Sequence, residues 1–387
     1  MTFGTHADSL RAAGAATCRG ISARGLVFAT RGFVYLVVTL AALVWTFIWL
    51  RYAVRHGTLG FDFEGTLWDA GVAILDGRSP YPRPVAAEVD VGNPAVYPPL
   101  LMTLVAPFTI LPWGVGLALW TGVLIGSIVG GLYLLEVRDP RCYALALISA
   151  PVLSGFILGN ATVLLVPLVA LVWRWRDRWY RAGVVLGLAI AVKLVLLPLL
   201  LWLLGTRRYR AFVAAVGAAC AGVIVPWAVI GFDGFTAYPN LLRVAARTFG
   251  PHGYSLATML RALGLDTELA IRASLLAGLV LGVFAFVAGR RGRDTAAVSL
   301  AVLAAILGAP IVAQYYYALL LVPLAIVRPR FSGLWMILPL FYFANRLPIW
   351  LLSDSPPRLW PALANAGVAL SVVLIAFASS DRMPRST

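Results

Sequence analysis

The chain has 387 residues, of which 61% are hydrophobic and only 12% are charged. Soluble domains carry roughly 25% charged residues, so this composition excludes soluble, disordered and disulfide-stabilised secreted proteins. The net charge of +15 comes from short arginine clusters between apolar segments, and we interpret these clusters as topology signals and not as a surface for nucleic acid. The sequence therefore predicts an all-α, polytopic membrane protein.

Apolar segments of about the length that spans a bilayer, roughly 20 residues, recur along the chain. The segments predicted as helices are Phe33–Val54, Trp113–Leu135, Cys142–Leu158, Ala161–Val172, Ala211–Ile230, Leu269–Ala288, Thr295–Val312, Tyr315–Val327, Phe331–Phe343 and Trp360–Ser379. With the broken segment described below, we expect about 12 crossings in a single domain over residues 33–380. A cytoplasmic N-terminal segment (1–32) and a cytoplasmic tail (381–387) flank this domain.

Two long segments, residues 55–112 and 231–268, are predicted on the extracytoplasmic side, because the arginine clusters favour the cytoplasm. In the first outer loop, apolar residues recur at helical spacing from Leu67 to Leu75, and Gly77 follows as a stop signal. This pattern predicts an amphipathic helix that lies on the outer membrane surface.

Two carboxylates, Asp62 and Glu64, precede this surface helix. One interpretation is that Asp62 caps the helix, where the helix dipole favours a negative charge. The other is that Asp62 is a general base, which accepts a proton from an attacking hydroxyl group.

The segment Ala182–Gly205 lies between two arginine clusters. One continuous helix would place one cluster outside the cell, so we predict two half-length helices that meet near Lys193, the single lysine of the chain. Broken helices at membrane depth are tolerated around a protected cavity, and a lysine there usually faces that cavity. The alternative is that Lys193 reaches toward the lipid headgroups.

Ordered motifs along the chain resemble a known family. The acidic pair is followed by Ala73-Ile74-Leu75-Asp76-Gly77-Arg78-Ser79-Pro80-Tyr81, Tyr97-Pro98-Pro99-Leu100, Leu158-Gly159-Asn160-Ala161-Thr162, Gly183-Val184-Val185-Leu186-Gly187-Leu188-Ala189, Lys193 and Pro198. This order is similar to that of glycosyltransferase family 87, membrane enzymes of the GT-C superfamily that use polyprenyl-phosphate sugars. The late W-x-H-H signature of the family is missing, and Gln314 and Tyr315 stand in its place.

The resemblance implies an inverting transferase of a bacterial plasma membrane, with its active site facing the extracytoplasmic side. The implied donor is a polyprenyl-phosphate sugar, mannose or arabinofuranose, and the implied acceptor is a glycolipid or glycan. Asp62 would be the base, with Glu64 as second candidate, and neither a cofactor nor a metal ion is expected.

The remaining candidate residues are expected to bind the donor or the substrates. Those expected to bind the donor phosphate or lipid are Lys193, Arg243, Arg247, His252, Gln314 and Tyr315. Those expected to bind substrate are Tyr81, Tyr97, Asn160 and Tyr254. Arg243 and Arg247 share a helix face, and they either bind phosphate or anchor the second outer loop at the interface.

Two other functions stay open. Broken helices and an intramembrane lysine also fit a transporter or flippase of a lipid-linked envelope precursor. A non-catalytic member that scaffolds envelope machinery is the third hypothesis, and in that case Asp62 and Lys193 would be replaceable without effect.

Overall fold

Helices are the regular elements of the described chain. The computed structural model describes residues 37, 40, 43, 44, 46–83, 94–250, 253–344 and 359–380. The chain divides into two compact units, Met1–Arg51 and Tyr52–Thr387. The described residues of the first unit are helical. Expectations for His252, the segment 1–32 and the tail 381–387 lie outside the described residues.

Among the described residues, three helices are long and apolar enough to cross a membrane: α6 (Trp113–Leu134), α12 (Tyr209–Val229) and α15 (Thr267–Arg290). The further helices of the second unit include α9 (Leu165–Arg174), α10 (Trp179–Val192), α11 (Leu199–Gly205), α14 (Leu256–Ala262), α16 (Asp294–Leu307), η6 (Gln314–Leu320), α17 (Leu321–Val327), η7 (Gly333–Ile337), α18 (Leu340–Ala344) and α19 (Leu359–Ser380). The all-helical class is therefore confirmed for the described chain, while a total of about 12 crossings stays a prediction.

The segment Cys142–Leu158, predicted as one helix, forms two. α7 (Pro140–Leu147) and α8 (Ala150–Leu158) are bent by 56° relative to each other, and they count as a fourth span if the pair is one crossing. The break has a local cause, because Ser149 is extended and Pro151 lies in the first turn of α8. A proline in this position has no N–H to donate to a preceding turn.

The predicted break at Lys193 is confirmed. α10 ends one residue earlier, and Lys193 has extended backbone angles (φ −154°, ψ 115°) before the 3-10 turn η4 (Leu194–Leu196) leads into α11. The chain then returns to the side from which it came. Arg208, just after α11, pairs with Asp177, just before α10, at 3.3 Å.

Glycines let α10 pack closely against α12. A Cβ atom at Gly183 would lie 2.5 Å from the carbonyl oxygen of Ala211, and one at Gly187 would collide with the Ala215 carbonyl oxygen. Small residues of this kind allow two helix backbones to approach in a membrane. The contact fixes the end of α10, and with it the backbone of Lys193.

The first outer loop begins with a nearly continuous helix. It consists of α2 (Phe61–Phe63), the π-helical turn η1 (Glu64–Trp68) and α3 (Asp69–Leu75). Gly77 follows with a φ of 68°, a left-handed conformation that suits glycine. The helix predicted in this loop is thus present, while its position on an outer membrane surface stays a prediction.

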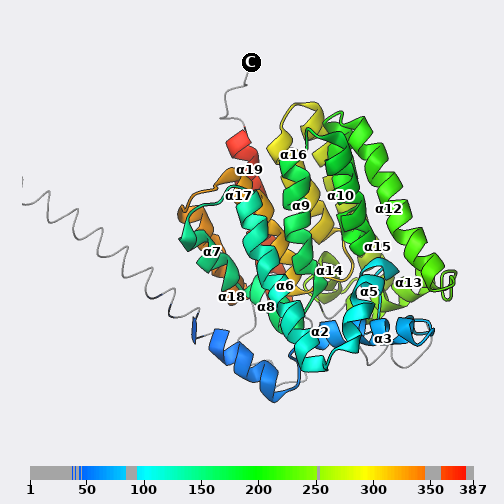
Figure 1. Cartoon of the computed structure of the whole chain (residues 1–387). Helices are drawn as coiled ribbons and strands as arrows, with labels where there is room; N and C mark the ends of the chain where they lie inside the picture. The colour runs from blue at the N-terminus through cyan, green and yellow to red at the C-terminus, as the bar shows by residue number, and fades with distance from the viewer. Residues whose placement is uncertain are drawn as a thin grey trace, which may run out of the picture. The chain divides into compact units, whose positions relative to one another are not determined.

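Aromatic stacking holds this helix against α6. Phe63 stacks on Trp113 and Trp120, with ring centroids 5.7 and 5.0 Å away. Figure 1 shows α2 and α3 at one end of the long helices, together with α5 (Pro99–Val105) and α13 (Tyr238–Phe249). A 3-10 turn, η2 (Ala106–Ile110), follows α5 and contacts α3.

Arginines gather at the opposite end of α6. Arg174 donates to the carbonyl oxygen of Leu134, the last residue of α6, at 3.2 Å. A helix of this length extends about 33 Å, at 1.5 Å per residue. The ion pairs near this end join Arg176, Asp177, Arg208 and Asp294. The second unit therefore has an arginine-rich end and an end that carries Asp62.

Candidate active site

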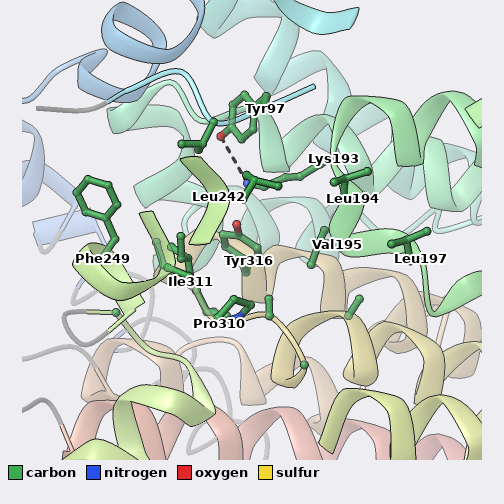
Figure 2. Close-up of a pocket in the computed structure, with 18 of the residues that line it drawn as sticks. Tyr97, Lys193, Leu194, Val195, Leu197, Leu242, Phe249, Pro310, Ile311 and Tyr316 are labelled. Carbon is green, nitrogen blue, oxygen red and sulfur yellow. Dashed lines mark hydrogen bonds between the residues drawn. The ribbon is translucent and has the colours of Figure 1, made fainter. Parts of the chain in front are cut away.

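A cavity of about 940 Å³ lies within the second unit. Its polar lining includes Asp62, Tyr97, Asn160 and Lys193, which come from α2, the segment before α5, the α8–η3 turn and the α10–η4 break. Figure 2 shows the Lys193 side chain directed toward Tyr97, with Tyr316 on its other side. Most of the remaining lining is apolar.

Asp62 faces this cavity and is buried, with 9% of its surface exposed. Its Oδ2 atom accepts a hydrogen bond from Asn160 Nδ2 at 2.7 Å. Gly60 occupies the N-cap position of α2, without a side-chain capping bond, and Asp62 lies in the first turn of this helix. Asp62 is therefore not the N-cap, although its place in the first turn is one that the helix dipole favours for a carboxylate. Glu64 is exposed and is not part of the cavity lining.

Asn160 orients the Asp62 carboxylate. It is the N-cap of the 3-10 turn η3 (Ala161–Leu164), and its Oδ1 atom accepts from Thr162 N at 2.9 Å and from Thr162 Oγ1 at 2.6 Å. Because the amide oxygen is used in this way, the amide nitrogen is directed to the other side. There it donates to Asp62 and, at 3.0 Å, to the Tyr97 hydroxyl.

Lys193 completes the same network. Its Nζ atom donates to Thr162 Oγ1 at 2.6 Å and to the Tyr97 hydroxyl at 3.4 Å. The ammonium group also lies 4.2 Å from the ring centroid of Tyr316 and 5.6 Å from that of Tyr315, distances typical of cation–π contacts. Lys193 is 7% exposed and lines the cavity, so the interpretation that it reaches toward headgroups is wrong.

Of three further residues predicted to bind the donor or a substrate, two line the cavity and one does not. Tyr315 lines it and hydrogen-bonds to Asp62. Tyr254 lines it as well. Gln314 is buried outside the lining, where its Nε2 atom donates to the carbonyl oxygen of Phe341 at 3.2 Å.

The two arginines of α13 lie on the outside of the cavity wall. Arg243 and Arg247 are exposed and are not part of the lining. Arg243 donates to Asn240 at 3.3 Å, and Arg247 pairs with Glu268. Another face of the same helix supplies lining residues, namely Leu242, Ala246 and Phe249.

Tyr81 also lies outside the lining, although it touches the segment that carries Tyr97. Its hydroxyl donates to the backbone carbonyl of Tyr97 at 2.8 Å. The sequence-based candidates did not include Thr162 or Tyr316, which both contact Lys193. A signal for the position of Thr162 existed, since an asparagine side chain often hydrogen-bonds to the backbone two residues further on. No signal singled out Tyr316 from its tyrosine neighbours.

Among the described residues, no group of three or more His, Cys, Asp or Glu side chains is arranged to hold a metal ion. The part of the cavity lined by Asp62, Tyr97, Asn160 and Lys193, which we call its polar end, offers a carboxylate, an ammonium group, an amide and phenol hydroxyls. This set can accept a proton and can stabilise an anion.

Residues 95–313, more than half of the chain, match glycosyltransferase family 87. The chain belongs to this family. The resemblance seen in the sequence motifs is thereby confirmed. The matched segment contains Tyr97, Asn160 and Lys193, and Asp62 precedes it.

This family member is similar to two actinobacterial proteins named polyprenol-phosphate-mannose-dependent alpha-(1-2)-phosphatidylinositol pentamannoside mannosyltransferase. The relative from Mycolicibacterium smegmatis is 30% identical over 230 residues, which are 57% of this chain and 54% of the relative, about half of its length. The relative from Mycobacterium tuberculosis is 27% identical over 404 residues, which cover 92% of this chain and 89% of the relative. No solved structure matches the chain.

Proposed function

We propose that this chain is an integral-membrane glycosyltransferase that moves a sugar from a polyprenyl-phosphate donor to a cell-envelope glycolipid or glycan, with inversion. Family membership and the relatives' names support this reaction, and the names favour mannose over arabinofuranose. The observation that carries the proposal is the polar end of the cavity, where one hydrogen-bond network holds a carboxylate and an ammonium group.

The apolar part of the cavity supports a lipid-linked donor. Leu197, Leu275 and Leu279 line the cavity, and they are also 48%, 53% and 59% exposed. The apolar wall therefore continues onto the outer surface of the helices, between the η4–α11 junction and α15. An isoprenoid chain would lie along this wall, with its phosphate and sugar at the polar end.

Lys193 would stabilise the leaving group. When the bond between the sugar C1 atom and the phosphate oxygen breaks, the electron pair stays on the polyprenyl phosphate. This product is a stable anion, so it requires a positive charge and hydrogen bonds and no protonation. Lys193 is held by Thr162 and Tyr97 where it can supply that charge.

Asp62 would activate the acceptor. The acceptor hydroxyl oxygen attacks C1 from the face opposite the phosphate, and Asp62 takes the proton as the new C–O bond forms. The hydrogen bond from Asn160 leaves the Asp62 carboxylate in one orientation. Positioning of this kind brings the reacting groups together without a further entropy cost in the transition state.

The sidedness of the molecule supports chemistry on the outer face of the plasma membrane. Asp62 and the arginine clusters lie at opposite ends of α6. Because arginine-rich loops stay in the cytoplasm, the Asp62 end would face outward. Nucleotide sugars are not available there, so a lipid-linked donor fits this location.

The test is sugar transfer by the purified protein in proteoliposomes. Labelled polyprenyl-phosphate mannose or arabinose is supplied with a cell-envelope lipid extract. Asp62→Asn should lower kcat by about 10²- to 10⁴-fold, the usual contribution of a general base, while donor binding persists. Asp76→Asn, an exposed carboxylate outside the cavity lining, is the matched control and should leave transfer unchanged.

Full transfer by the Asp62→Asn protein would contradict the role of Asp62. Absence of transfer by the wild type with both donors would contradict the proposed reaction. If the wild type then moved an unchanged lipid-linked sugar across the bilayer, the transporter hypothesis would replace it.

A further inference from the structure

The segment before α5 brings Tyr97 into the polar end of the cavity. Residues 94–98 form neither helix nor strand, with a bend at Tyr97, and Pro98 and Pro99 follow Tyr97 directly. Prolines lack an N–H group and hold the preceding residue in an extended conformation. Because no β-strand lies among the described residues, the carbonyl oxygens of this segment have no sheet partner and need other donors.

Two tyrosine hydroxyls supply these donors. Tyr238, the first residue of α13, donates to the Val96 carbonyl at 2.9 Å. Tyr81, from the first outer loop, donates to the Tyr97 carbonyl at 2.8 Å. Consecutive carbonyls on the segment are therefore held from two separate parts of the chain.

The two tyrosines are themselves anchored. Trp227, near the end of α12, is 1% exposed. The Tyr81 ring stacks on it with centroids 4.8 Å apart and an angle of 18°, and the Tyr238 ring meets it edge-on at 5.7 Å. Tyr81 and Tyr238 also contact each other at 5.3 Å. We call Tyr81, Tyr238 and Trp227 the tyrosine clamp.

We propose that Tyr81 and Tyr238 are positioning residues, which set the location of the Tyr97 hydroxyl and through it the Lys193 ammonium group. This inference rests on the proposed function. Tyr81 lies outside the cavity lining, whereas Tyr238 is part of the lining and its hydroxyl is used by the Val96 carbonyl. Both would act through the Tyr97 hydroxyl, which accepts hydrogen bonds from Lys193 and Asn160. Loss of the clamp would let the segment shift and would misalign the ammonium group with the departing phosphate.

Phenylalanine substitutions test the clamp, because they remove only the hydroxyl groups and keep the ring contacts. Tyr81→Phe and Tyr238→Phe should each lower kcat about tenfold, in line with the large cost of small misplacements in active sites. The donor KM should change less than kcat, since Lys193 stays in the cavity. Tyr143→Phe is the matched control, because the Tyr143 hydroxyl donates to the Val137 carbonyl at 2.8 Å outside the cavity lining.

A second measurement does not depend on activity. Lys193 is the single lysine of the chain, so lysine labelled with ¹³C at Cε gives one side-chain NMR signal from a full-length protein with a lysine-free tag. Tyr81→Phe and Tyr238→Phe should move this signal, and Tyr143→Phe should not. The thermal unfolding temperatures of the three variants show whether a change reflects a general loss of stability.

The proposal is overturned if the Lys193 signal and kcat are unchanged in both clamp variants. It is also overturned if Tyr81→Phe has the same effect in a Tyr97→Phe background, because the clamp would then not act through the Tyr97 hydroxyl. A wild-type protein that transfers no sugar would contradict the proposed function, while the Lys193 signal would still decide whether the clamp positions this group.

Discussion

The Thr162 hydroxyl joins the two halves of the proposed active site. It accepts from Lys193 and donates to Asn160, and Asn160 in turn donates to Asp62. Thr162 is fully buried and lies outside the cavity lining, so it would act only through its neighbours. Its substitution therefore separates the geometry of the network from direct contact with a substrate.

Thr162→Val keeps the shape of the side chain and removes the hydroxyl group. We expect a loss of about 1–3 kcal/mol in the free energy of unfolding, because Lys193 loses a buried hydrogen-bond partner. Transfer activity should fall at the same time, since the lysine would turn away from its observed position. Unfolding and kcat measurements on Thr162→Val and Thr162→Ser check this, and equal values for the two variants would show that the hydroxyl is dispensable.

For single residues, sequence analysis predicted Asp62, Asn160 and Lys193 as site residues, but it did not predict the hydrogen bonds that connect them. Lys193 is recognisable as the single lysine inside an apolar segment, and Asp62 as a carboxylate at the start of the outer-loop helix. Asn160 was predicted from the family resemblance. Asn160 contacts Asp62 from 98 positions away, and Lys193 contacts Thr162, the partner of Asn160, from 31 positions away. No local pattern encodes such pairs. The exposure of Arg243 on the outer side of α13 depends on the packing of that helix, which its sequence alone does not reveal.

At the scale of the elements, charge and glycine placement decide where helices break and how closely they pack. The break at Lys193 followed from the arginine clusters at both ends of the segment. The bend between α7 and α8 was missed, although Pro151 marks it, because the apolar run continues through it. The π-helical turn η1 has no sequence signature, because it depends on how the turn packs against its surroundings.

Two glycines on the packed pair α10 and α12 give a matched prediction. A Cβ atom at Gly187 would collide with the Ala215 carbonyl oxygen and lie 2.7 Å from the Ala219 nitrogen, whereas one at Gly217 would meet no atom within 4 Å. Gly187→Ala should destabilise the protein by about 1–3 kcal/mol, the usual cost of overpacking. Gly217→Ala should be neutral or slightly stabilising, because alanine favours helix. Thermal unfolding of both variants tests this prediction. A Gly187→Ala protein as stable as the wild type would show that α10 and α12 separate easily.

At the scale of the molecule, the separation of charge between the two ends of the second unit predicts the orientation in the membrane. Asp294 connects several residues at the arginine-rich end. It forms an ion pair with Arg208 at 2.8 Å and accepts a hydrogen bond from Trp202 Nε1 at 2.6 Å. The Asp62 end has the cavity and the helices α2, α3 and α13, which belong to the two loops predicted to lie outside. The composition predicted a membrane protein, and the arginine clusters predicted its orientation. The cavity could not be predicted in this way, because apolar content does not specify which helix faces line a cavity.

Cysteine labelling tests this orientation directly. In a background without Cys18, Cys142 and Cys220, a cysteine is placed at Asp76 in the first outer loop or at Arg291 in the α15–α16 turn, both exposed positions. The Asp76→Cys substitution removes the exposed ion pair between Asp76 and Arg78. This loss should lower the free energy of unfolding by about 0–1 kcal/mol, so the fold is kept. A membrane-impermeant thiol reagent should label Asp76→Cys in intact cells and Arg291→Cys only after permeabilisation, because arginine-rich turns remain cytoplasmic. The reverse pattern would place Asp62 on the cytoplasmic side, where nucleotide sugars are available, and would remove the argument for a lipid-linked donor.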